Sequence, residues 1–181
     1  MKKELQLATF AGGCFWCTEA IFLRLQGVEK VVSGYTGGTI KNPAYREVCT
    51  GITGHAEAIQ ISFDDTVISF TELLEVFFAT HDPTTLNRQG NDIGTQYRSA
   101  IYYSDVEQKR KAEAYIKLLI DENIFENPIV TEITELGPFY LAEENHENYY
   151  NLNKEQSYCQ FVIQPKLKKL SKYYSQKLKS E

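Results

Sequence analysis

The sequence predicts an α+β fold in which helices cover a sheet, as in a two-layer α/β sandwich. Strand-like and helix-like segments follow one another in the order β-α-β-β-α-β, with a further α-β at the end. Two stretches show neither the helical nor the strand repeat of apolar residues. They are 38–54, which is rich in Gly, Pro and Asn, and 81–97. They are predicted to be long irregular loops. The order of segments is typical of a ferredoxin-like split β-α-β core.

The strands are predicted where apolar and β-branched residues run together or alternate over short stretches. The clearest is AEAIQISF, in which the alternation is typical of a half-buried strand. The expected strands are 5–11, 28–35, 56–63, 99–103 and 129–135.

Three helices are predicted between these strands. The first covers 14–26 and ends at a glycine, which favours helix termination. Ser69 and Glu72 fit a capping box at the start of the second helix, whose apolar face repeats at helical spacing. Ser104 and Glu107 fit another capping box at the start of the third helix, which is expected to continue to about residue 119.

The length and composition favour a single domain over 1–181, with a core at about 5–160. Apolar residues make up 43% of the 181 residues and charged residues 24%, as in ordinary globular proteins. The tail at about 164–181 is basic and carries leucines and tyrosines at helical spacing. We expect it to be a helix with a solvated basic face, in preference to a docking patch.

The charge balance and the cysteines indicate the class of protein and its compartment. The net charge of −5 argues against nucleic acid as the main partner, because phosphate binding needs clustered basic residues. No apolar run is long enough to span a membrane, and the start MKKELQLATF lacks the apolar core of a signal peptide. We therefore expect a cytoplasmic protein, whose four cysteines are redox-active, metal-binding or simply buried.

Cys14 in AGGCFWCTEA lies where the first strand ends and the first helix begins. A helix N-terminus has free N–H groups and a positive dipole end, which stabilise an anion such as a thiolate. Gly12 and Gly13 permit unusual dihedral angles and close approach of a substrate. Cys14 is therefore a candidate nucleophile, although its position is also compatible with a small buried residue.

Cys17 completes a Cys-x-x-Cys pair with Cys14, at a spacing compatible with a disulfide at a helix start. Phe15 and Trp16 between them are compatible with an apolar wall beside Cys14 or with core packing. Zinc is a weaker alternative and we expect no metal, because the remaining candidate ligands form no second close pair. Those candidates are Cys49, Cys159, His55, His81 and His146.

Four long motifs resemble the A-type peptide methionine sulfoxide reductases. They are AGGCFWC, GYTGG at 34–38, NPAYREVCTGITGHAEAIQISFD at 42–64 and HDPTTLNRQGNDIGTQYRSAIYY at 81–103. The resemblance implies reduction of the S epimer of methionine sulfoxide, free or in proteins, to methionine. It also implies the two-layer α/β sandwich, no bound cofactor, and thioredoxin as the external reductant.

The resemblance also assigns roles to residues that match the family's motifs. Cys14 resembles the nucleophile and Glu57 the acid that protonates the sulfoxide oxygen. Glu57 lies in the alternating strand, where a carboxyl on the covered face would be desolvated and its pKa raised. Phe15 and Trp16 resemble the pocket for the substrate methyl. The polar groups around the oxygen are expected to be Tyr45, Asp92 and Tyr97.

Attack by Cys14 would leave a sulfenic acid, which a second thiol converts to a disulfide. Cys17 is one helical turn away, whereas Cys159 matches a recycling cysteine of relatives. The tail lacks the glycines and further cysteine of those relatives, so both candidates stay open. Cys49 is expected to be buried, and the three histidines are expected to be structural.

A different class of enzyme remains possible from these residues. A general dithiol–disulfide oxidoreductase would use Cys14 and Cys17 and would have no need of Glu57.

Overall fold

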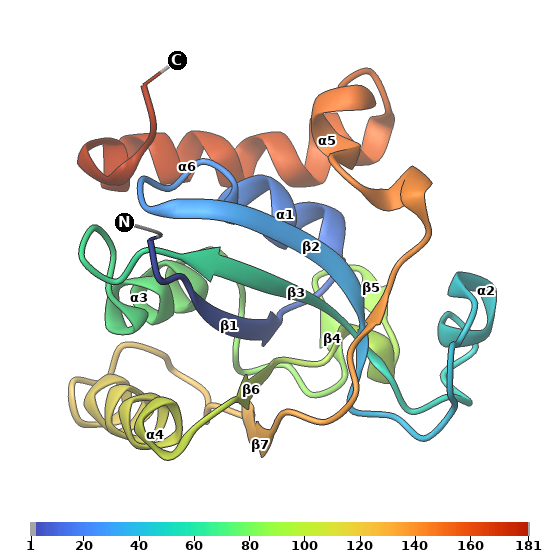
Figure 1. Ribbon diagram of the computed structural model, residues 1–181, viewed down its shortest axis with the longest axis horizontal. Coiled ribbons are helices and arrows are strands. Elements are labelled where there is room, and N and C mark those ends of the chain that lie inside the picture. Colours follow the sequence, from blue (N-terminus) through green and yellow to red (C-terminus); the bar gives the residue numbers. More distant parts are fainter. Residues whose placement is uncertain (1–2, 181) are drawn as a thin grey trace.

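A central sheet organises the structure, a computed structural model that describes residues 3–180 (Figure 1). The described residues form a six-stranded sheet of order β7-β6-β1-β3-β2-β8. Its strands are β1 (Gln6–Ala11), β2 (Val28–Thr36), β3 (Ala56–Phe63), β6 (Ala100–Tyr103), β7 (Glu132–Glu135) and β8 (Tyr140–Leu141). Neighbouring strands are antiparallel except β6 and β7, which are parallel.

The connection between β1 and β2 confirms the predicted split β-α-β core. Both strands pair with β3 and run antiparallel to it, so they are parallel to each other with β3 inserted between them. The helix α1 links them. The helices are α1 (Phe15–Phe22), α2 (Tyr45–Val48), α3 (Phe70–Thr80), α4 (Val106–Asp121), α5 (Tyr149–Leu152) and α6 (Gln164–Tyr174).

Of the two predicted capping boxes, the structure contains one and lacks the other. Ser69 and Glu72 form the expected capping box: the Ser69 hydroxyl accepts from the Glu72 N–H, and the Glu72 carboxylate accepts from the Ser69 N–H. The pairing of Ser104 with Glu107 was wrong. Asp105 is the N-cap of α4 and accepts from the Gln108 N–H at 2.8 Å, because an aspartate one residue later offers the same short acceptor.

The main core lies between the sheet and the helices on one of its faces. Phe10 of β1 contacts the rings of Phe22, Phe70 and Phe77, with centroids 4.8–5.9 Å apart. Burial of each such ring contributes about 2 kcal/mol. These rings fix α1 and α3 against β1, and so set where α1 begins.

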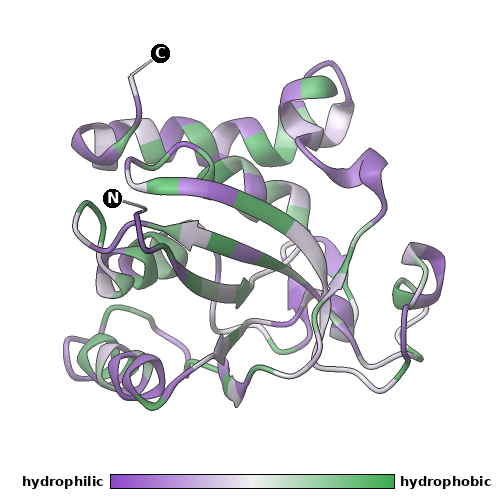
Figure 2. Ribbon diagram, viewed as in Figure 1, coloured by the Kyte–Doolittle hydropathy of each residue, from purple (hydrophilic) through white to green (hydrophobic). Residues whose placement is uncertain are grey.

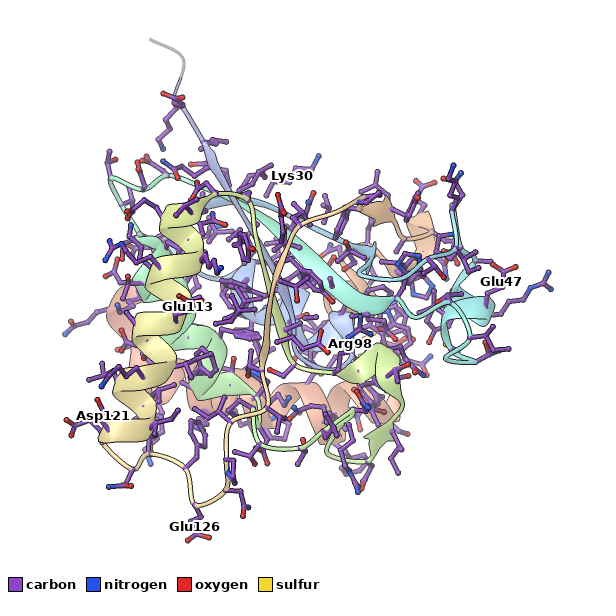
Figure 3. All side chains as sticks on the ribbon, turned by 90° about the horizontal axis from the view of Figure 1, so that it is seen from below. Lys30, Glu47, Arg98, Glu113, Asp121 and Glu126 are labelled. Carbon is purple, nitrogen blue, oxygen red and sulfur yellow. The ribbon has the colours of Figure 1, made fainter. Side chains whose placement is uncertain are left out.

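The opposite face of the sheet carries small side chains. Ala11, Ala56, Ala58 and Ala100 are buried there, and the segment 136–141 packs over them. A Cβ on Gly34 would lie 2.4 Å from the Tyr140 carbonyl oxygen, so this segment approaches β2 as closely as a glycine allows. Figure 3, seen from below Figure 1, shows Asp121 at the end of α4 and Glu126 in the loop after it pointing to solvent.

The two predicted loops contain short elements that sequence periodicity cannot reveal. Residues 38–54 include the four-residue helix α2, and 81–97 include the hairpin of β4 (Arg88–Gln89) and β5 (Asp92–Ile93). A 3-10 turn, Thr95–Tyr97, follows the hairpin. Elements of two to four residues span only about one period of their pattern, which is too short for the repeat to be recognised.

The C-terminal segment returns to α1 and contacts it. A π-helical turn, Cys159–Ile163, leads into α6, which packs on α1 and α3. Leu167 and Leu170 of α6 are buried, and Figure 2 shows hydrophobic and hydrophilic residues alternating along this helix. The Gln26 N–H donates to the Lys177 carbonyl at 2.7 Å. Within residues 3–180, no helix is both long and apolar enough to cross a membrane.

Candidate active site

Cys14 is held at the junction of β1 and α1. It is the N-cap of α1, and its carbonyl accepts from the Cys17 N–H at 3.1 Å. Gly13 before it has φ +91°, and a Cβ there would lie 2.7 Å from the Gln89 side chain of β4. The glycine therefore allows both the turn and the close approach of the β4–β5 hairpin. The thiol of Cys14 is buried, with 8% of the residue exposed.

Glu57 lies on the face of β3 that the helices cover, as its strand alternation predicts. It shares that face with Ile59 and Ile61 and is 1% exposed. Its Oε1 accepts from the Phe15 N–H at 3.2 Å, one residue after Cys14. Its Oε2 has no hydrogen-bond partner within the described residues. One carboxyl oxygen is thus fixed beside the candidate nucleophile and the other is unpaired.

Burial controls the protonation of Glu57. It raises the pKa of this carboxyl to about 8; the Phe15 N–H opposes the rise and the negative charge of Asp92 adds to it. Glu57 is therefore mostly protonated at neutral pH. It is a neutral carboxylic acid in a water-poor site, which is the form that can give a proton to a developing oxyanion.

The thiol of Cys14 differs from the sequence-based expectation. Its pKa is raised well above the ordinary value, chiefly by burial, with the charges of Glu57 and Cys17 adding to the effect. The Trp16 N–H and the Tyr158 hydroxyl act in the opposite direction, but they do not outweigh burial. The stabilisation of a thiolate by the helix N-terminus is therefore smaller than the cost of desolvation. Resting Cys14 is a thiol.

Tyr45 and Tyr97 precede and follow Glu57 in the chain, and the charge of Glu57 affects both phenols. Tyr45 is the first residue of α2 and Tyr97 ends the 3-10 turn. Burial, followed by the charge of Glu57, raises the pKa of both phenols. At neutral pH they therefore stay neutral hydrogen-bond donors, as an oxyanion site requires.

Phe15 and Trp16 have different surroundings. Phe15 is fully buried and packs against Tyr35 and Tyr45, at centroid distances of 5.7 and 6.4 Å. Trp16 is half-buried and stacks on Tyr149 at 3.8 Å with an interplanar angle of 6°. Its Nε1–H donates to Nδ1 of His146 at 3.0 Å. His146 thus has a structural role, as expected, and that role is to hold Trp16.

Asp92 lies on the Cys17 side of the site. Its Oδ2 accepts from the hydroxyl of Tyr158 at 2.7 Å, and the same hydroxyl oxygen is 3.6 Å from the Sγ of Cys17. Tyr158 was missed by the sequence reasoning. The signal available for it was its position directly before Cys159 in SYCQ, in a stretch that has no clear period.

The cysteines separate into a buried group and an exposed one. Cys17 and Cys159 are 1% and 0% exposed. The charge of Cys17 raises the pKa of Cys14, and the charge of Cys159 raises the pKa of Cys17. Cys17 therefore neighbours both. The prediction that Cys49 is buried was wrong: Cys49 follows the short helix α2 and is exposed. Within residues 3–180, no three His, Cys, Asp or Glu side chains converge as metal ligands.

Two hollows are lined by residues of the site. The first, of about 510 Å³, is lined by residues that include Cys14, Cys17, Asp92, Tyr158 and Lys166; we call it the thiol cavity. The second, of about 450 Å³, is lined by residues that include Trp16, Tyr45, Arg46, His146 and Tyr149. Cys14 thus lines the thiol cavity, and Trp16 and Tyr45 line the second hollow.

Residues 6–178 match the family described as Peptide methionine sulfoxide reductase. The chain belongs to this family. The expected family is confirmed, and the match includes all the site residues named above. Two relatives called peptide methionine sulfoxide reductase MsrA are similar over nearly the whole chain. That of Trichodesmium erythraeum is 55% identical, covering 94% of this chain and 96% of its own. That of Deinococcus radiodurans is 56% identical, covering 95% and 84%.

Solved reductases share the fold. Reduced Mxr1 of Saccharomyces cerevisiae is 34% identical with a TM-score of 0.81, covering 86% of this chain and 90% of that one. Methionine sulfoxide reductase A of Corynebacterium diphtheriae is 36% identical with a TM-score of 0.75, covering 84% and 77%. Mxr1 in complex with Trx2 is 23% identical with a TM-score of 0.57, covering 82% and 89%, and shows the fold alone. The predicted α+β sandwich is thereby confirmed.

Proposed function

We propose that this chain reduces the S epimer of methionine sulfoxide, free or in proteins, to methionine through a sulfenic acid on Cys14. One observation carries the proposal most strongly. Glu57 is a buried, largely protonated carboxylic acid whose Oε1 is fixed on the Phe15 N–H and whose Oε2 is unpaired within the described residues. Reduction of a sulfoxide needs such an acid beside a thiol, whereas thiol–disulfide exchange does not.

The first step transfers oxygen from the substrate to Cys14. Glu57 donates its proton to the sulfoxide oxygen, which makes the sulfur more electrophilic. The Cys14 sulfur attacks, and its proton returns to the Glu57 carboxylate. The bond between the substrate sulfur and its oxygen breaks, and the hydroxyl moves to Cys14. The products are methionine and Cys14 sulfenic acid, so the substrate sulfur is reduced and the cysteine sulfur is oxidised.

The polar and apolar groups have separate tasks in this step. Tyr45 and Tyr97 donate hydrogen bonds to the oxygen as it acquires negative charge. Asp92 contributes its negative charge, which helps to keep Glu57 protonated. Trp16 is the ring that meets the substrate methyl, and groups larger than methyl would clash with it. Phe15 has no exposed surface and supports this wall by packing against Tyr45 and His146. His146 and Tyr149 fix the plane of Trp16.

Recycling then uses a second thiol and an external reductant. Cys17 is the proposed partner, since it is one helical turn from Cys14 and interacts with that thiol directly. Cys159 lies beyond Cys17 and is the alternative. A thioredoxin is the proposed external reductant, in keeping with the Mxr1 relative solved together with Trx2. No bound cofactor is needed, because the thiols supply both electrons.

Further proposals concern the organisation of the chain and its compartment. The return of α6 to α1 and α3 supports one catalytic domain over 1–181, with α6 as part of it. The cysteines of the described chain are all free, which supports a reducing compartment such as the cytoplasm.

The pH dependence of methionine formation tests the role of Glu57. The acid form is required, and the pKa of Glu57 is about 8. In a single turnover we expect a constant rate at neutral pH and a fall of about tenfold per pH unit above that pKa. Ionisation of Cys14 does not mask the fall, because its pKa is higher still. A rate that instead rises through pH 8–9 would identify thiol ionisation as the controlling event and remove Glu57 as the acid.

A further inference from the structure

Tyr158 links a thiol to a carboxylate within the site. Its hydroxyl donates to the Oδ2 of Asp92 at 2.7 Å and lies 3.6 Å from the Sγ of Cys17. The oxygen-transfer step proposed above gives the hydroxyl no proton to move, although the hydroxyl also lowers the pKa of the Cys14 thiol. The tyrosine therefore has a polar contact that the first step leaves unexplained.

The surroundings of Tyr158 hold its ring in this position. The residue is half-buried, and its ring meets Trp16 edge-on at 5.9 Å and 80°. Asp92 comes from the β4–β5 hairpin and Cys17 from the first turn of α1, so the hydroxyl joins segments that are distant in the sequence. All three residues line the thiol cavity.

The thiol of Cys17 needs a proton acceptor if it is to attack. Burial raises its pKa, and the charges of Asp92 and Cys159 add to this, while Lys166 and the Tyr158 hydroxyl oppose it. The residue is 1% exposed, so water has little access to the sulfur. Burial also raises the pKa of the Tyr158 phenol, so the phenol cannot keep a negative charge. The hydroxyl can only pass a proton on while another group accepts one.

We propose that Tyr158 is a catalytic residue of disulfide formation, passing the proton of Cys17 to Asp92 as Cys17 attacks the Cys14 sulfenic acid. The inference rests on the proposed function, which supplies that sulfenic acid. It assigns Tyr158 to the second step of the reaction and not to oxygen transfer.

The step balances in atoms and electrons. The Cys17 sulfur attacks the Cys14 sulfur, forming the S–S bond and breaking the S–O bond of the sulfenic acid. The thiol proton passes to the Tyr158 oxygen while the Tyr158 proton passes to Asp92. Glu57 protonates the departing hydroxide, which leaves as water. Cys17 is oxidised and Cys14 is reduced, and solvent afterwards moves the proton from Asp92 back to Glu57.

Tyr158→Phe separates the two steps in a single turnover. The reduced protein is mixed with methionine sulfoxide, and methionine, the Cys14–Cys17 disulfide and sulfenic acid trapped by a cyclic diketone are followed over time. Because the hydroxyl also lowers the pKa of the Cys14 thiol, we expect methionine formation to slow as well, but disulfide formation to slow by at least about tenfold more. The trapped sulfenic acid should accumulate in the variant and not in the wild type.

Two variants serve as controls for this experiment. Tyr173→Phe removes the hydroxyl of an exposed tyrosine on α6 and should leave both steps unchanged. Cys17→Ser should form methionine and accumulate trapped sulfenic acid, which shows the signal of a blocked second step.

Other outcomes overturn the inference in distinguishable ways. A wild-type rate of disulfide formation in Tyr158→Phe would show that the hydroxyl is not needed. Equal slowing of methionine and disulfide formation would show that Tyr158 only supports the structure. A wild-type disulfide between Cys14 and Cys159 would remove Cys17 from the step. Absence of methionine from the wild-type protein would instead overturn the proposed function itself.

Discussion

Replacement of Cys14 by serine is expected to remove detectable methionine formation, a loss of at least about 10⁴-fold. Serine keeps the size and the N-cap position, but its hydroxyl is a far weaker nucleophile than a thiol and cannot accept the oxygen as a sulfenic acid. The measurement is methionine released from methionine sulfoxide with a dithiol reductant in excess.

The matched control is Cys49→Ser. Cys49 is exposed, and serine preserves a polar group towards Tyr45, so most of the activity should remain. Folding of Cys14→Ser is checked by thermal unfolding. Substantial turnover by a folded Cys14→Ser protein would contradict the assignment of the nucleophile.

Replacement of Glu57 by glutamine is expected to lower the rate of methionine formation by about 10²–10⁴-fold. The amide oxygen can still accept from the Phe15 N–H, but glutamine cannot give a proton to the sulfoxide oxygen. The loss should appear in kcat and in single-turnover rates, whereas alkylation of the cysteines should still occur. The variant should also lose the fall in rate above the pKa of Glu57, at about 8.

Thermal unfolding of Glu57→Gln shows whether a loss of activity comes from the missing proton donor or from a destabilised fold. The folded protein raises the pKa of Glu57 to about 8, whereas an unfolded chain has a glutamate pKa of about 4.3. The folded state thus binds the proton more tightly, so stability falls as pH rises between these values. Glu57→Gln removes that dependence and should unfold at a temperature no lower than the wild type at pH 8.

Glu113→Gln on α4 is the control for the charge change. Glu113 is exposed on a helix away from the site (Figure 3), so neither rate nor stability should change measurably. A Glu57→Gln protein that is folded and reduces methionine sulfoxide at the wild-type rate would favour general dithiol exchange by Cys14 and Cys17.

Local sequence patterns predicted most of the fold because its main elements are long enough to show a period. AEAIQISF alternates over a full strand, and this alternation also placed Glu57 on the covered face, where it is buried. The hairpin of β4 and β5, the helix α2 and the strand β8 have two to four residues each and show no period. Their positions depend on tertiary contacts, such as that of β8 with β2.

The parts of the site that could not be predicted depend on long-range packing. Tyr158 reaches Asp92 across 66 positions of sequence, and His146 reaches Trp16 across 130. The protonation of Cys14 was predicted from the helix N-terminus alone, which favours a thiolate. Desolvation works in the opposite direction and is larger here, and only the folded surroundings reveal how deeply the thiol is buried.

The central claim is that Cys14 takes the oxygen of methionine S-sulfoxide and then forms a disulfide with Cys17. It is tested most directly by reducing the protein, removing the reductant and adding racemic methionine sulfoxide in excess. Methionine is counted per protein and by epimer, and the disulfide is mapped by mass spectrometry. We predict about one methionine per protein, from the S epimer alone, and a Cys14–Cys17 link. No methionine, or methionine without a Cys14–Cys17 disulfide, would contradict the account.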